Sequence, residues 1–185
     1  TIVFASRTQK ELMRDPLTYI FGIGLPVVLI VLMSVINRKI PGAPFAIEGF
    51  APGMAVFSLA FLSLFGGLLV AKDRCSSFLM RVFASPMRAW EFIAGYSLPL
   101  ILMALIEGVF CFAAAMAMGL ELSVNMLYAL AALLPAALMY IALGILMGTL
   151  MSDKQVGGIA SLIINAATLL SGTWFALDLV GEGFR

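Results

Sequence analysis

Five long stretches without charged side chains dominate the chain, and only the third of them is interrupted, by Glu107. A helix needs roughly 20 apolar residues to cross the hydrocarbon core of a bilayer, and every stretch is long enough. Membrane β-barrel strands alternate apolar and polar residues, whereas these stretches are apolar throughout. We therefore predict an all-α integral membrane protein with one domain over residues 1–185. Its predicted transmembrane helices are 16–37, 49–71, 92–118, 126–151 and 155–177.

Composition excludes several classes of function. Of the 185 residues, 63% are hydrophobic and 11% are charged, whereas about 25% of the residues of a soluble domain are charged. The net charge of +1 provides no basic field for nucleic acid, so DNA and RNA are not expected partners. The chain has no histidine and only two cysteines, Cys75 and Cys111. We therefore expect no metal site, no catalytic residues and no enzymatic activity.

The distribution of Lys and Arg predicts the orientation, because positive charges concentrate in cytoplasmic loops. Of the eleven basic residues, eight fall on the same side as the N-terminus, while Arg38, Lys39 and Arg185 fall on the other. We therefore expect a multi-pass protein of the plasma membrane with a cytoplasmic N-terminus. Because the chain begins at Thr1 and ends at Arg185, just after the fifth predicted span, we also expect it to be a piece of a longer protein.

The first fourteen residues have the pattern of an amphipathic helix. Charged residues recur at i, i+3, i+4 and i+7, so they share one arc of a helix: Arg7, Lys10, Glu11 and Arg14. The apolar residues expected on the opposite side are Ile2, Ala5, Leu12 and Met13. The pattern predicts a helix over 1–14 that lies in the inner membrane interface and ends at Asp15-Pro16. A solvated N-terminal extension is the alternative interpretation.

The segment 72–91 is too long for a simple turn between two spans. Ser76 and Ser77 are residues that begin helices, and Ser85-Pro86 ends one. The apolar residues between them share one face of a short helix: Phe78, Leu79, Val82 and Phe83. Arg74, Arg81 and Arg88 border this face. Physical chemistry alone supports two interpretations equally, docking into a groove on another protein or resting on lipid headgroups.

Glu107 lies near the middle of the third predicted span. Ionising a carboxyl group at that depth costs at least ~2.5 kcal/mol, so Glu107 must face protein or water. Three interpretations are open. Glu107 is part of a translocation path or a proton-sensitive site, or it is a protonated or hydrogen-bonded acid that joins two helices, or its span is locally distorted. Cys111, one helical turn later, is expected to serve packing alone.

Small residues and prolines mark the spans themselves. Gly144 and Gly148 form a GxxxG motif, which permits two helices to approach closely. We expect this motif to pack inside the chain rather than to form a dimer. Pro26, Pro99 and Pro135 lie within predicted spans, where a proline frees a carbonyl group and bends the helix.

Several local motifs occur in a characteristic order. They are Arg14-Asp15-Pro16, Pro52-Gly53, Lys72-Asp73-Arg74 followed by Arg81 and Ala84-Ser85-Pro86, Gly144 with Gly148, residues 152–158, and Ser171-Gly172. With the order of spans and amphipathic segments, the chain resembles the permease subunits of ABC-2 type transporters over nearly its whole length. It departs from that pattern at Cys75-Ser76-Ser77, where a glycine is frequent, and at 173–176, where a proline is common.

The resemblance implies a permease that pairs in the membrane, as a homodimer or a permease heterodimer, and that couples to a cytoplasmic ABC ATPase. It implies that residues 1–14 form an elbow helix and that a sixth span follows Arg185. It also implies an ATPase-coupling helix made by Phe78, Leu79, Arg81, Val82 and Phe83. The chain lacks the phosphate-binding pattern G-x-x-x-x-G-K-[ST]. We therefore expect no cofactor in this chain, with ATP and Mg²⁺ on the partner ATPase.

Three functional hypotheses follow. The first is the membrane subunit of an ATP-driven exporter for a lipophilic drug, a lipid or a lipid-linked glycan, in contact with membrane lipid. The second is an ion-coupled carrier or channel that uses Glu107. The third is a membrane protein that transports nothing, among which an intramembrane enzyme is least favoured because Glu107 is the only acid deep in a span.

Overall fold

The computed structural model describes residues 2–39, 47–76, 78, 82, 84, 87–121 and 124–170, and no strand occurs among them. This confirms the all-α prediction. The helices are α1 (Ile2–Arg14), α2 (Pro16–Tyr19), the π-helix η1 (Ile20–Gly24), α3 (Leu25–Lys39), α4 (Ile47–Cys75), α6 (Ala89–Ala117), α7 (Val124–Leu150) and α8 (Asp153–Leu170).

Four helical segments are long and apolar enough to cross a membrane, and they match the first four predicted spans. They are Pro16–Lys39, Gly49–Cys75, Ala89–Ala117 and Met126–Leu150. The first of them is built from α2, η1 and α3 in succession. Helix α8 covers the fifth predicted span as far as Leu170, and residues 171–177 lie outside the described residues, so that span stays a prediction.

The helices around the predicted cytoplasmic segment are longer than the uncharged stretches. Helix α4 continues past residue 71 to Cys75, and Arg74 donates a 2.7 Å hydrogen bond to the carbonyl oxygen of Met151 beyond α7. Helix α6 begins at Ala89 because the carboxylate of Glu91 accepts a 2.9 Å hydrogen bond from the backbone N–H of Arg88. These two helices therefore include charged residues that the uncharged stretches had left outside the predicted spans.

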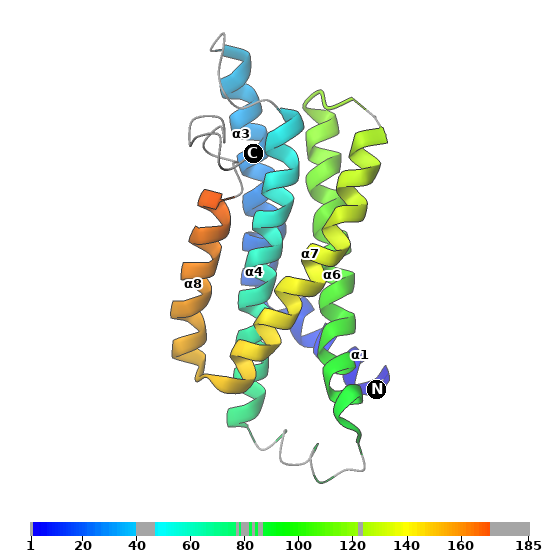
Figure 1. Ribbon diagram of the computed structural model, residues 1–185, viewed down its shortest axis with the longest axis vertical. Helices are drawn as coiled ribbons and strands as arrows, with labels where there is room; N and C mark the ends of the chain where they lie inside the picture. The colour runs from blue at the N-terminus through cyan, green and yellow to red at the C-terminus, as the bar shows by residue number, and fades with distance from the viewer. Residues whose placement is uncertain are drawn as a thin grey trace, which may run out of the picture.

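Helix α4 is the centre of the bundle and packs against α3, α6, α7 and α8, and Figure 1 shows α7 running obliquely across it. A Cβ atom at Gly144 would collide with the carbonyl oxygen of Ser63, and one at Gly148 with that of Gly67. The two glycines therefore allow α7 to touch the α4 backbone. This confirms the expectation that the GxxxG motif packs inside the chain.

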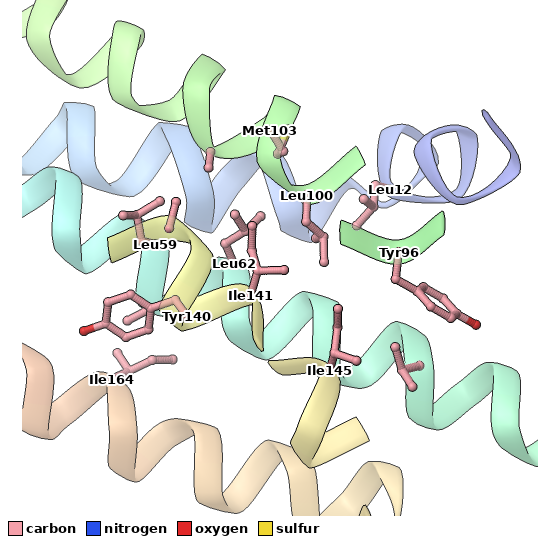
Figure 2. Close-up of a cluster of buried hydrophobic side chains, with 14 of the residues drawn as sticks. Leu12, Leu59, Leu62, Tyr96, Leu100, Met103, Tyr140, Ile141, Ile145 and Ile164 are labelled. Carbon is pink, nitrogen blue, oxygen red and sulfur yellow. The ribbon is translucent and has the colours of Figure 1, made fainter. Parts of the chain in front are cut away.

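The main core lies where α4, α6, α7 and α8 meet, and α1 closes one end of it (Figure 2). Between membrane helices there is no water to exclude, so side-chain packing rather than the hydrophobic effect holds these contacts. The buried side chains labelled in Figure 2 are Leu12, Leu59, Leu62, Tyr96, Leu100, Met103, Tyr140, Ile141, Ile145 and Ile164.

Helix α1 packs on the bundle through one narrow face. Its buried residues are Phe4, Thr8 and Leu12, which recur every fourth position on one face. Two of the residues predicted for the apolar face are exposed, Ile2 at 83% and Met13 at 60%. The prediction assigned the apolar side to the membrane interface rather than to the bundle, so for these two residues it stays a prediction. Apolar character alone does not separate a side chain that faces protein from one available to lipid.

Candidate coupling cluster and membrane carboxyl

A buried carboxylate near the C-terminal end of α4 joins three helices. Asp73 is 4% exposed and accepts two hydrogen bonds from Arg7 of α1, at 2.7 Å to Oδ2 and 2.9 Å to Oδ1. The hydroxyl of Tyr96 in α6 donates a third hydrogen bond to Oδ2, at 2.7 Å. Bidentate pairing of Arg with a carboxylate fixes geometry as well as energy. The Asp73 carboxylate thus holds α1, α4 and α6 in one arrangement.

Arg7 also contacts the segment that follows α4. Its guanidinium carbon lies 3.7 Å from the centre of the Phe78 ring, a cation–π contact. The hydrogen bonds to Asp73 raise the pKa of Arg7 above its ordinary value. A further ion pair, 2.6 Å long, joins Arg7 to Glu11 on the same helix. The charge of Arg7 therefore links α1 to both Asp73 and Phe78.

Aromatic packing reinforces this link. The ring of Phe4 lies 5.8 Å from that of Phe78 and 4.9 Å, edge to face, from that of Tyr96. A Cβ atom at Gly95 would collide with the Phe4 ring, so this glycine lets α1 lie directly on α6. We call Phe4, Arg7, Asp73, Phe78 and Tyr96 the Asp73 cluster.

The predicted coupling residues fall partly within the described residues. Phe78 and Val82 are half-buried, and Phe78 packs on α1 within the Asp73 cluster. Leu79, Arg81 and Phe83 lie outside the described residues. The backbone N–H of Phe78 donates to the Ser76 hydroxyl at 3.2 Å, in keeping with the expectation that this serine begins the helix. The contact of these residues with an ATPase stays a prediction.

Glu107 is completely buried in α6 and meets α4 at Ser58. The Ser58 hydroxyl oxygen lies 2.5 Å from Oε2 of Glu107 and 2.8 Å from the carbonyl oxygen of Gly22. One hydroxyl proton can serve only one of these two acceptors. Both contacts are satisfied when Glu107 is protonated and donates to Ser58, while Ser58 donates to Gly22. Within the described part of the chain, no Lys or Arg forms an ion pair with Glu107.

The partner of Ser58 follows from the sequence of the first span. Pro26 has no N–H to donate to the carbonyl group four residues earlier, which is that of Gly22. This stretch forms the π-helix η1, and Ser58 supplies a donor to Gly22 from α4. A Cβ at residue 22 would collide with Oε1 of Glu107, so Gly22 also makes room for the carboxyl group. Oε1 is buried and has no hydrogen-bond partner.

Metal binding has no support in the part of the chain that the structure describes. No group of three or more metal-ligating side chains of the types His, Cys, Asp and Glu occurs there.

Sequence reasoning missed most partners in both sites. Arg7 and Asp73 are separated by 66 positions, and no local pattern connects them. Two weak signals were available. Asp73 is an acid within one turn of the end of a span, and Ser58 is one of two serines, with Ser63, in an otherwise apolar stretch. The clearest unused signal was Pro26, because the carbonyl group that it frees must find another donor.

Comparison with known proteins gives one match. A family model described as ABC-2 type transporter matches residues 1–185, the whole chain. No curated protein and no solved structure matches.

Proposed function

Because this chain belongs to the ABC-2 type transporter family, we propose that it is the membrane-spanning permease subunit of an ATP-driven exporter. In this proposal a cytoplasmic ABC ATPase binds the segment after α4. Together, the permease and the ATPase then move a lipophilic or lipid-linked substrate out of the cytoplasm. We place the protein in the plasma membrane with its N-terminus in the cytoplasm, on the strength of the Lys and Arg distribution.

The observation that carries the proposal is the Asp73 cluster. Phe78 belongs to the segment predicted to meet the ATPase, and it contacts Phe4 and Arg7 of α1. Arg7 is fixed to Asp73 at the end of one span, and Asp73 is fixed to Tyr96 at the beginning of another. A displacement of Phe78 would therefore reach two membrane-spanning helices through short, directional contacts. Such a path suits the rigid-body movement of spans that an ATP-driven cycle requires.

The proposed substrate class has support from a cavity between the inner halves of α6 and α7. Its volume is about 580 Å³, within the range of roughly 300–1,000 Å³ for small-molecule sites. Apolar side chains form most of its wall, including Phe92, Ile141 and Leu146, and two hydroxyls, from Ser97 and Thr149, also line it. A lipophilic molecule with few hydrogen-bonding groups fits this surface.

Affinity purification of the full-length protein from native membranes tests the partner. We expect an ATPase with a phosphate-binding loop to co-purify, and the Phe83→Asp variant to lose it. Trp90→Asp is the matched control, because Trp90 is an exposed aromatic residue at the inner end of α6, outside the 78–83 segment. Purification without an ATPase, or an unchanged yield from Phe83→Asp, would overturn the proposal.

Phe78→Ala tests the transmission path separately. This variant removes the ring that contacts Arg7 and Phe4 but leaves residues 79–83 intact. We expect it to keep the ATPase and to lose most substrate-stimulated ATP hydrolysis in reconstituted membranes. Equal stimulation in the variant and the wild type would show that the force does not pass through the Asp73 cluster.

One observation favours the alternative of an ion-coupled carrier or channel. Oε1 of Glu107 is buried without a hydrogen-bond partner, as expected for an oxygen that binds a proton or cation at another stage. Glu107→Gln distinguishes the two functions. It should abolish pH-dependent flux in a proton carrier, whereas in the ATP-driven exporter the amide replaces a neutral carboxyl group and activity should largely persist.

A further inference from the structure

A cavity of about 530 Å³ lies at the junction of α1, α2 and α4, beside the Asp73 cluster but with none of its five residues in the wall. We propose that it binds the headgroup of an anionic phospholipid in the leaflet that contains α1. The ligand class is one with a phosphate, a headgroup hydroxyl and an acyl chain, for which phosphatidylglycerol is the simplest representative. Charge, hydrogen bonding and the wall of the cavity each support this assignment.

Two cationic side chains of the cavity wall have no partner of their own among the described residues. Arg14 and Lys72, from α1 and α4, line it and are exposed, and neither forms a hydrogen bond or an ion pair with any residue that the structure describes. The two acids of the cavity wall are already engaged. Glu11 pairs with Arg7, and Asp15 accepts hydrogen bonds from the N–H of residue 17, at 3.2 Å, and the hydroxyl of residue 18, at 3.1 Å. The side chains of Arg14 and Lys72 are therefore available to contact an anionic group.

One acceptor in the wall lacks a donor. Oε2 of Glu11 is buried without a hydrogen-bond partner, while Oε1 takes the Arg7 contact. A buried acceptor without a donor costs free energy, so a ligand that supplies one is favoured. A headgroup that carries hydroxyls beside its phosphate can donate to Glu11 while its phosphate contacts Arg14 and Lys72.

The apolar wall that α4 contributes to the cavity distinguishes a lipid from a free phosphate ion. Phe65, Leu68 and Leu69 of α4 line the cavity directly before Lys72. These three residues belong to the candidate span Gly49–Cys75, so the apolar wall continues toward the membrane interior. An acyl chain can lie on this wall while the headgroup stays at the level of Lys72. Inorganic phosphate would use only the cationic part.

Native mass spectrometry of the purified full-length protein in mild detergent tests the proposal. Phosphatidylglycerol or phosphatidylcholine is titrated from mixed micelles, and bound lipid is counted. The test variant is Arg14→Gln/Lys72→Gln. The control, Lys10→Gln/Lys154→Gln, removes the same charge from two exposed lysines that do not line the cavity.

We expect wild type and control to bind phosphatidylglycerol about 30-fold more tightly than the test variant, from two headgroup charge contacts of ordinary size. Phosphatidylcholine should bind weakly to all three proteins, and millimolar inorganic phosphate should displace no lipid. Equal binding by test variant and wild type, no preference between the lipids, or displacement by inorganic phosphate would each overturn the proposal. The melting temperature in lipid-free detergent confirms that the test variant is folded.

Discussion

Replacing Asp73 with Asn is the most informative single change in the Asp73 cluster. The substitution keeps the size of the side chain but removes the charge to which Arg7 and Tyr96 donate. Breaking a buried ion pair costs ~3–5 kcal/mol. The Arg7 side chain is 31% exposed, so water recovers part of that energy. We therefore expect Asp73→Asn to lower the free energy of unfolding by about 2–3 kcal/mol.

Equilibrium unfolding of the purified full-length protein in mixed micelles measures this effect. Tyr96→Phe should cost only about 1 kcal/mol, because it removes one hydrogen bond and leaves the pair of Arg7 and Asp73 intact. The control is Asp153→Asn at the exposed start of α8. Among the residues that the structure describes, this carboxylate accepts only the 2.8 Å hydrogen bond from the N–H of residue 154. If Asp73→Asn costs no more than Asp153→Asn, the argument that this carboxylate holds three helices is refuted.

Two further substitutions test the contacts of α4. Gly148→Ala should destabilise the bundle by ~1–3 kcal/mol, because the added Cβ collides with the α4 backbone. Gly157→Ala, whose Cβ would meet nothing within 4 Å, should be neutral or stabilising, and thermal melts compare the two. Ser58→Ala should cost ~1–3 kcal/mol, because it leaves buried groups unpaired, whereas Ser161→Ala on exposed α8 should cost little. Equal melting temperatures for the two variants of either pair would show that the corresponding contact of α4 does not stabilise the bundle.

The parts of the fold that sequence predicted are those that depend on one local property. The length of the stretches without charged residues predicted the four candidate spans, and the spacing of Gly144 and Gly148 predicted a close helix crossing. The face that α1 turns inward could not be read in this way. Phe4 lies inward because Gly95 leaves room for its ring, and these two residues are 91 positions apart in the printed sequence.

The candidate sites were harder to predict, because their geometry depends on pairings between distant residues. Glu107 was identified from its cost in lipid, but nothing in the sequence assigned Ser58 as its neighbour. Asp73 appeared only as one letter of a charged motif, and the structure shows that its partners are Arg7 and Tyr96. The sequence identifies a carboxyl group that is costly to bury, whereas tertiary packing determines which side chain hydrogen-bonds to it.

The wide turn Ile20–Gly24 has a consequence for aligning this chain with its relatives. A π-helical turn closes its hydrogen bonds from residue i to i+5 and so holds one residue more than an α-helical turn. Within the first span, a one-residue deletion is therefore best accommodated in this turn, although Pro26 would still leave one carbonyl group without its N–H donor. Where a relative has such a deletion, an alignment that forbids gaps within spans would misplace every residue before that point by one.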